Sequence, residues 1–362
     1  MEAVEIIPRV FPDLSFIHVA DFIHQLRTSR KRIVVLKLAS ILALAARISP
    51  SLLADPKRSR CLSQQLSAYT QQNLWPGLVQ EPDTDTMHCL LLTAQYEWGD
   101  GNGFAAWMYS GRPSSLDRAS LKINLPCTDD EFDLGVPAAN PLTYSQLLST
   151  NAESLGRKFT IADHSAVIVR SGDIWFRACK WVAEGGRRKS SVVNSCPWET
   201  DSEWHQIKTE IFEWRRMLDS SIKYPQTPVA VYVRRRQAES FAFINLIHYL
   251  SILMIYREYL PFVPKDRNEV ICGPIQPPLL LRQAPQGWWQ EYYDILFDSS
   301  TRITQIITEL EDAHISLLTP HTGYCVFSAA SMNVYRSAFP WADPGNARRP
   351  DATELKRRDL DF

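Results

Sequence analysis

The chain has 362 residues, of which 45% are hydrophobic and 22% are charged, and its formal net charge at pH 7 is −1. A chain of this length and apolar content can bury one large core or two smaller ones, which excludes global disorder. The near-zero net charge gives no general attraction to phosphate backbones, so the composition does not indicate nucleic-acid binding.

The first residues do not resemble a secretory signal, because Glu2 and Glu5 make the segment acidic where a signal peptide is basic. The two most apolar runs, residues 33–48 and 241–256, are each about 16 residues long, which is shorter than the ~20 residues needed to cross a bilayer. Both runs are expected to be buried helices, and no membrane partner is expected.

Periodic apolar spacing predicts an all-α chain. The predicted helices cover residues 19–26, 33–48, 57–73, 84–109, 166–170, 174–182, 204–218, 241–259, 292–317 and 324–339. Thr200-Asp201-Ser202-Glu203 is expected to cap the helix that begins near Trp204. Residues 241–259 are apolar on nearly all sides and are expected to form the central helix. Thr319-Pro320 is expected to end the long helix before it.

Residues 84–109 predict a helical hairpin. Five apolar positions share one helical face: Met87, Leu90, Leu91, Ala94 and Trp98. Asp83 or Asp85 is expected to cap the first helix, and Gly99 is expected to end it in the left-handed conformation. Gly101-Asn102-Gly103 allows the chain to reverse, but no strand precedes it as a phosphate-binding loop would require.

Several segments resemble the regulatory "middle homology" domain of fungal zinc-cluster transcription factors. They are Leu42-Ala43-Leu44-Ala45-Ala46-Arg47, Tyr96-Glu97-Trp98-Gly99, Ala106-Trp107-Met108-Tyr109, Gly111-Arg112-Pro113 with residues 123–132, and Arg257-Glu258-Tyr259-Leu260-Pro261-Phe262. The resemblance is discontinuous over about residues 20–340. It implies a bundle of stacked helical hairpins, with residues 1–339 as the regulatory domain and residues 340–362 as a polar, flexible tail.

The resemblance also implies two missing parts. In the family, two more helices separate the segment like Trp107-x-Tyr109 from the loop like Gly111-Arg112-Pro113, so an internal deletion is expected near residues 109–111. The family's DNA-binding module holds zinc with six closely spaced cysteines, whereas the seven cysteines here are scattered and form no Cys-x-x-Cys pair. They are Cys61, Cys89, Cys127, Cys179, Cys196, Cys272 and Cys325. This scatter suits free thiols in a reducing compartment.

The function implied by the resemblance is transcription regulation in the nucleus. Zinc binding and DNA binding are expected of the full family but not of this chain alone. Its expected partners are proteins of the transcription machinery or a homologous regulator, with a small-molecule effector as a further possibility. Four basic clusters are candidate import signals: Arg27 to Arg32, Arg187-Arg188-Lys189, Arg234-Arg235-Arg236 and Lys356-Arg357-Arg358. The last cluster is favoured because it lies in the polar tail.

The alternative is an all-helical protein that binds a small molecule or acts as a magnesium-dependent, terpene-cyclase-like enzyme. Residues 129–133 match the Asp-Asp-x-x-Asp pattern of those cyclases, and carboxylates suit a hard cation. Pro126 and Pro137 flank this pattern and predict a loop or a single turn, and no second magnesium motif is present. His314 and His321 form no metal-binding motif, and most tryptophans fall on helical stripes. No enzyme, cofactor, catalytic residue or metal ligand is therefore predicted.

Overall fold

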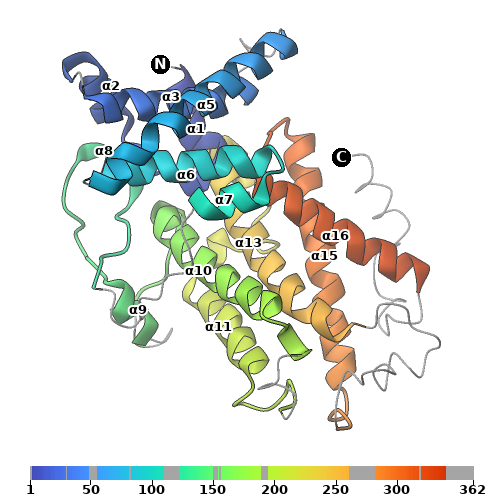
Figure 1. Cartoon of the computed structure of the whole chain (residues 1–362). Helices are drawn as coiled ribbons and strands as arrows, with labels where there is room; N and C mark the ends of the chain where they lie inside the picture. The colour runs from blue at the N-terminus through green and yellow to red at the C-terminus, as the bar shows by residue number, and fades with distance from the viewer. Residues whose placement is uncertain are drawn as a thin grey trace. The chain divides into compact units, whose positions relative to one another are not determined.

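The computed structural model describes residues 2–29, 31–48, 55–80, 83–109, 122–149, 154, 156–188, 195–260, 282–317 and 319–339. Every regular element in these ranges is a helix, with only two isolated β-bridges beside them (Figure 1). The all-α prediction is therefore confirmed. The chain divides into two compact units, Met1–Leu148 with Ser316–Pro320 and Ser149–Ile315 with His321–Phe362. The assignment of residues 1–339 to a single regulatory domain stays a prediction.

The first unit is built around α3. Its helices are α1 (Glu2–Val10), η1 (Pro12–Leu14), α2 (Val19–Thr28), α3 (Arg32–Ile48), α5 (Pro56–Gln80), α6 (Thr84–Gly99), α7 (Gly103–Tyr109), α8 (Asp129–Leu134) and α9 (Tyr144–Ser149). Helix α3 packs against α1, α5 and α6. Its small residues let α5 approach closely, because the hydroxyl of Ser63 donates to the carbonyl of Ala43 at 2.7 Å.

Helices α6 and α7 form the predicted hairpin. Asp83 caps α6 by accepting from the Thr86 amide at 2.8 Å. The prediction for Gly99 is wrong, since Gly99 is the last residue of α6 and the left-handed residue is Gly101, with φ +83°. Glycine at position 99 serves close packing instead: a Cβ there would lie 3.2 Å from the Arg47 guanidinium of α3.

The second unit is built around α13. Its helices are η3 (Ile161–Asp163), α10 (His164–Ala183), η4 (Gly186–Arg188), α11 (Glu203–Met217), η5 (Ser220–Ile222), α12 (Val229–Arg235), α13 (Ala238–Tyr256), η6 (Arg257–Tyr259), α15 (Trp288–Asp312) and α16 (Pro320–Ala338). Helix α13 contacts α10, α11, α12 and α15, as the central position predicted for it requires (Figure 1).

Among the described residues, Ala238–Tyr259 is the one helical stretch long and apolar enough to cross a membrane, and 89% of its most apolar window is buried inside the protein. Aromatic rings close one end of this helix. Trp204 of α11 stacks on Tyr292 of α15 and donates from its indole nitrogen to the Ile255 carbonyl at 3.0 Å. The buried Trp181, Trp204 and Trp214 belong to the core, as their helical spacing predicts.

Three helix boundaries differ from the predictions. Residues 166–170 and 174–182 belong to the single helix α10, because one glycine such as Gly172 weakens a helix by only about 1 kcal/mol. Helix α15 ends at Asp312, and the chain turns at His314, whose φ is +57°. Leu317 therefore lies outside the helix, although it continues the apolar pattern.

Helix starts also differ from the predictions. Pro320 begins α16, where its missing amide hydrogen costs nothing, and does not end the preceding helix. The cap of α11 is Ser202, which accepts from the His205 amide at 3.1 Å, so Thr200 is not the capping residue. The apolar spacing of the sequence predicted none of α1, α9 and α12. The Gly111-Arg112-Pro113 loop and the tail at residues 340–362 lie outside the described residues.

Candidate functional site

A hollow opens among α10, α11 and α13 in the second unit, and we call it the central hollow. The empty volume between its atoms is about 280 Å³, and this volume includes the open mouth. Six apolar residues line it: Ile174, Ile211, Trp214, Leu218, Ile244 and Ile247. Four polar residues complete the lining: Ser171, Arg215, His248 and Ser251. An apolar wall with a few polar groups is the usual composition of a small-molecule site, but the enclosed part of this hollow has room for only about one water molecule.

The lining follows from helical periodicity. Residues 211, 214, 215 and 218 follow an i, i+3, i+4, i+7 spacing, and residues 244, 247, 248 and 251 of α13 repeat it. In each stripe the i+4 position holds a cation or an imidazole, Arg215 in α11 and His248 in α13. The helical periodicity that buries Ile211 and Trp214 thus brings a charged residue to the same wall.

Arg215 binds only neutral oxygens. Its Nη2 donates to the Asn245 side-chain oxygen at 2.8 Å and to the Tyr224 carbonyl at 3.0 Å. Its Nη1 is buried and has no hydrogen-bond partner. Among the residues that the structure describes, no carboxylate forms an ion pair with Arg215. Burial lowers the pKa of Arg215 to about 10, so the guanidinium stays charged at neutral pH.

Asn245 is the hub of this network. Its amide nitrogen donates to the carbonyls of Phe241 at 2.7 Å and Ile222 at 3.1 Å. Its oxygen accepts from the Tyr224 amide at 2.9 Å as well as from Arg215. All four hydrogen bonds of the amide are made, which fixes its orientation and holds the chain between α11 and α12 against α13.

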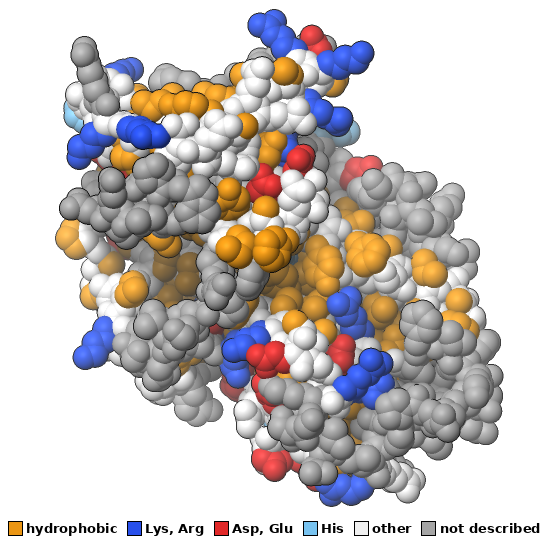
Figure 2. All heavy atoms as spheres, viewed as in Figure 1, with side chains coloured by type: hydrophobic (Ala, Val, Ile, Leu, Met, Phe, Trp, Pro, Cys, Tyr) orange, Lys and Arg blue, Asp and Glu red, His pale blue; other side chains and the backbone are white. Residues whose placement is uncertain are grey.

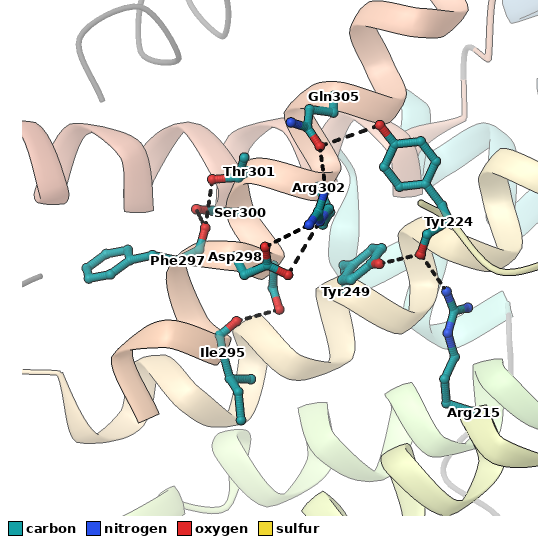
Figure 3. Close-up of polar contacts among 11 residues, drawn as sticks. Arg215, Tyr224, Tyr249, Ile295, Phe297, Asp298, Ser300, Thr301, Arg302 and Gln305 are labelled. Atoms are coloured by element: carbon teal, nitrogen blue, oxygen red, sulfur yellow. Dashed lines mark hydrogen bonds and ion pairs between the residues drawn. The ribbon is translucent and has the colours of Figure 1, made fainter. Parts of the chain in front are cut away.

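Tyr224 connects this network to α15. Figure 3 shows Arg215 and Tyr249 pointing at the Tyr224 carbonyl, to which the Tyr249 hydroxyl donates at 2.7 Å. The Tyr224 hydroxyl donates to Glu309 at 2.8 Å, and the other Glu309 oxygen accepts from the amide of Val229, the first residue of α12, at 2.9 Å. The position of Arg215 is therefore set by α11, α13 and α15 together.

Positive charge dominates around Arg215. Burial, together with the charges of Arg215 and Lys223, lowers the pKa of His248 well below its usual value, so its imidazole is neutral at pH 7. Burial lowers the pKa of Lys223, and the charges of Arg215 and Lys158 lower it further, whereas Asp219 raises it. Asp219 is the one carboxylate in this set that raises the pKa of Lys223, whereas the pKa of Arg215 is raised by the Tyr249 hydroxyl and by no carboxylate.

The acidic pattern at residues 129–133 lies on α8, a six-residue helix with no buried residue. Thr128 and Glu131 form its capping box, and Gly135 ends it with φ +64°. The prediction of a loop or a single turn is therefore too short, because α8 is a capped helix of six residues, somewhat less than two turns. Glu131 also accepts from the Ala139 amide at 2.7 Å, so this carboxylate has a structural role. Among the described residues, no three acidic, histidine or cysteine side chains converge as a metal site.

His314, His321 and the cluster Arg234-Arg235-Arg236 are not part of the central hollow's lining. His321 is buried between the rings of Trp175 and Phe243, at centroid distances of 5.2 and 5.0 Å, and His314 lies in the turn after α15. Arg234-Arg235-Arg236 ends α12 and is exposed, whereas Lys356-Arg357-Arg358 lies outside the described residues. Sequence reasoning missed Arg215, although its place within the 211–218 stripe is a signal that could have found it.

Known proteins similar to this chain are fungal regulators. The chain is 21% identical over 170 residues to the Zn(2)-C6 fungal-type transcription factor FTF1a of Fusarium oxysporum f. sp. lycopersici, a match that covers 47% of this chain and 14% of that protein. It is 19% identical over 227 residues to FTF1c of the same fungus, covering 62% and 22%. It is 23% identical over 212 residues to the transcriptional regulatory protein C530.11c of Schizosaccharomyces pombe, covering 58% and 23%.

The chain is thus a distant relative of proteins named as fungal transcription regulators, and these relatives support that family for it. The matches span less than a quarter of the length of each of these relatives. No family model and no solved structure matches the chain.

Proposed function

We propose that the chain is a helical regulatory domain that controls transcription through contacts with other proteins, in the nucleus. The observation that carries the proposal is the agreement between the named relatives and the all-helical architecture. The relatives are named as transcription regulators, which are not enzymes, and the acidic pattern lies on α8, a short capped helix with no buried residue. These observations favour regulation over the magnesium-dependent cyclase.

We propose contacts with proteins and not with DNA, because the positive and negative charges of the chain nearly cancel. The formal net charge is −1, and Figure 2 shows acidic and basic side chains interspersed on the coloured parts of the face it presents. DNA-binding surfaces concentrate Lys and Arg on one face. A DNA-binding partner, either a homologous regulator or another factor, would bring the chain to its genes.

For nuclear entry we propose the basic cluster Arg234-Arg235-Arg236. These residues end α12, and all three are exposed, so an import receptor can reach them. The cluster Lys356-Arg357-Arg358, which the sequence favours, lies outside the described residues and stays a candidate.

We also propose that the internal deletion near residues 109–111 is real. In support, Phe104 of α7 is 76% exposed and Met108 is 43% exposed, which suits a helix that has lost its packing partner. A transcript read through codons 107–113 that reveals an intron-like or deleted segment would support this proposal, and an uninterrupted reading frame that encodes a soluble monomer would contradict it.

The test of the regulatory function is a tethering experiment. The full chain is fused to a bacterial DNA-binding domain and expressed in yeast with a reporter that carries the matching operator. We expect reporter output to change several-fold relative to the DNA-binding domain alone. The control is the same fusion with Asn245→Leu, which breaks the network of the second unit. An expressed, nuclear wild-type fusion with unchanged reporter output would contradict the proposal.

A further inference from the structure

We propose that the outer face of α16 docks a second copy of this chain, with the two α16 helices antiparallel across a two-fold axis. The outer face consists of the exposed residues of this helix, Gly323, Phe327, Val334 and Ala338. This self-association goes beyond the regulatory function proposed above and does not depend on it.

The opposite face of α16 holds the helix on the second unit. The Cys325 thiol donates to the Leu246 carbonyl of α13 at 3.9 Å. The Asn333 amide donates to the Thr304 hydroxyl of α15 at 3.2 Å. These contacts are buried, and they fix which side of α16 is turned away from its own unit.

The outer face carries no charge. Every residue of α16 is described, and Arg336, its only Lys, Arg, Asp or Glu, is 1% exposed. A surface helix usually turns charged and polar side chains to water. The exposed residues of α15 follow this rule, since they are Gln290, Glu291, Asp298, Glu311 and Asp312. An exposed helix face without any polar side chain is suited to contact with another protein.

The spacing of the outer face selects a second copy as the partner. Gly323 and Ala338 lie equally far from the midpoint between residues 330 and 331, and so do Phe327 and Val334. A two-fold axis at this midpoint places Phe327 of each copy opposite Val334 of the other, and Gly323 opposite Ala338. The large ring meets a smaller side chain, the ends meet through small residues, and no like charges face each other.

The centre of the outer face is already ordered. The Phe327 ring stacks on the Tyr324 ring at a centroid distance of 6.5 Å. The Tyr324 hydroxyl accepts from Arg257 at 3.1 Å and donates to the Met254 sulfur at 3.3 Å. Ser331, beside the proposed axis, donates its hydroxyl to the Phe327 carbonyl at 2.8 Å. Association therefore costs little ordering of side chains and leaves this hydroxyl satisfied.

The size of the surface sets the strength of the association. Helix α16 has 19 residues and is therefore ~28 Å long. Two paired helices of this length bury on the order of 600 to 1,000 Å² in total, which is less than the ~1,200 Å² of stable complexes. We therefore expect a weak, reversible dimer with a Kd of about 10 to 100 µM.

The test is analytical ultracentrifugation of the purified full-length chain over a series of concentrations. We expect a monomer–dimer equilibrium for the wild type. Phe327→Glu should raise the Kd at least about tenfold, because association would bury an unpaired charge. The matched control is Phe104→Glu in α7, since Phe104 is 76% exposed and Phe327 is 64% exposed. The control should leave the Kd unchanged.

The antiparallel register has a test of its own. Phe327→Glu combined with Val334→Lys brings opposite charges together at two places in the antiparallel pair. The double variant should therefore dimerise more strongly than either single variant. In a parallel pair each new charge would meet the same charge of the other copy, so a double variant weaker than both single variants would overturn the antiparallel arrangement.

Three results would overturn the docking surface itself: a wild type that stays monomeric at about 200 µM, open-ended aggregation in place of a dimer, or equal effects of Phe327→Glu and Phe104→Glu. A monomer would leave the outer face to another protein or to residues 340–362. Circular dichroism checks folding, and if Phe327→Glu does not fold, Val334→Lys carries the same comparison. Because the readout is the oligomeric state and not transcription, failure here is distinct from failure of the tethering experiment.

Discussion

Among the described residues, each of the two units holds an ionisable side chain that has a buried polar atom without a hydrogen-bond partner and forms no ion pair, and the two side chains carry opposite charges. In the first unit, Asp13 of η1 accepts a hydrogen bond from the Gln95 side chain, and its Oδ1 is buried without a partner. In the second unit, Arg215 is held by neutral oxygens. An acid can escape the cost of a buried charge by binding a proton, whereas a guanidinium cannot lose one near neutral pH.

The pKa values express this difference. Burial raises the pKa of Asp13 from 3.8 to about 6, so the charge is lost at mildly acidic pH. The pKa of Arg215 falls only to about 10, so its charge persists. The comparison teaches that an acid without an ion pair is a pH-dependent weakness of the fold, whereas an arginine without an ion pair keeps its charge at every physiological pH.

The largest expected effect comes from removing the hub of the second unit. Asn245→Leu should lower the free energy of unfolding by about 3 to 5 kcal/mol, because it leaves a buried cation, a backbone amide and two carbonyls short of partners. Denaturant titration measures the loss. The control, Gln206→Leu, changes an exposed amide of α11 and should cost less than about 0.5 kcal/mol. Equal losses in both variants would show that Asn245 is not the hub.

The next largest effect is a pH-dependent gain in the free energy of unfolding when Asp13 of the first unit is replaced. The folded pKa of Asp13, about 6, lies above the ordinary 3.8, so the folded state holds the proton more tightly than the unfolded state. The resulting penalty is absent below pH 3.8, grows between pH 3.8 and 6, and is complete above pH 6. Asp13→Asn removes it and should stabilise the protein by up to about 3 kcal/mol at pH 8.

The measurement is the difference between Asp13→Asn and the wild type in unfolding free energy at pH 4 and pH 8. The gain should nearly vanish at pH 4. Asp21→Asn, at an exposed acid of α2 that accepts from Gln25, should give no comparable gain at either pH. A pH-independent difference for Asp13→Asn would mean that the carboxyl is not held in an unfavourable ionised state.

Much of the fold could be predicted from the sequence because most helices show a regular apolar period. The pattern placed α3, α11 and α13 within a few residues of their actual bounds, and it identified α13 as central. The end of α15 could not be predicted this way, since Leu317 continues the apolar spacing after the backbone has turned at His314. A non-glycine residue with positive φ gives no sequence signal of the kind that glycine gives.

The candidate site could not be predicted for a different reason. Arg215 and Arg216 are adjacent and chemically identical in the sequence, yet Arg215 is partly buried and bonded to Asn245, whereas Arg216 is 72% exposed. Only the apolar positions at 211, 214 and 218 indicate which of the two faces inward. Its partners, Tyr224 and Asn245, lie on different elements, and no local spacing connects them.

A smaller effect is expected where Tyr224 meets α15. Glu309→Ala should cost about 2 kcal/mol, because one carboxylate accepts both from the Tyr224 hydroxyl and from the first amide of α12. A double-mutant cycle with Tyr224→Phe separates the two contacts, and we expect a coupling of roughly 1 kcal/mol. Additive losses would show that the hydroxyl and the carboxylate do not support each other.

The smallest effect on stability should follow from Arg215→Met. If the fold depended on Arg215, the same change would cause a large loss of stability. Methionine fills much of the same volume, the Asn245 oxygen and the Tyr224 carbonyl each keep a second donor, and the unpaired buried charge is gone. We therefore expect a loss of less than about 1 kcal/mol, or a small gain, in unfolding free energy. Thermal and denaturant unfolding of the two proteins give the comparison. A loss above about 2 kcal/mol would mean that the hydrogen bonds of the guanidinium to Tyr224 and Asn245 are needed by the fold and outweigh the cost of its missing ion pair.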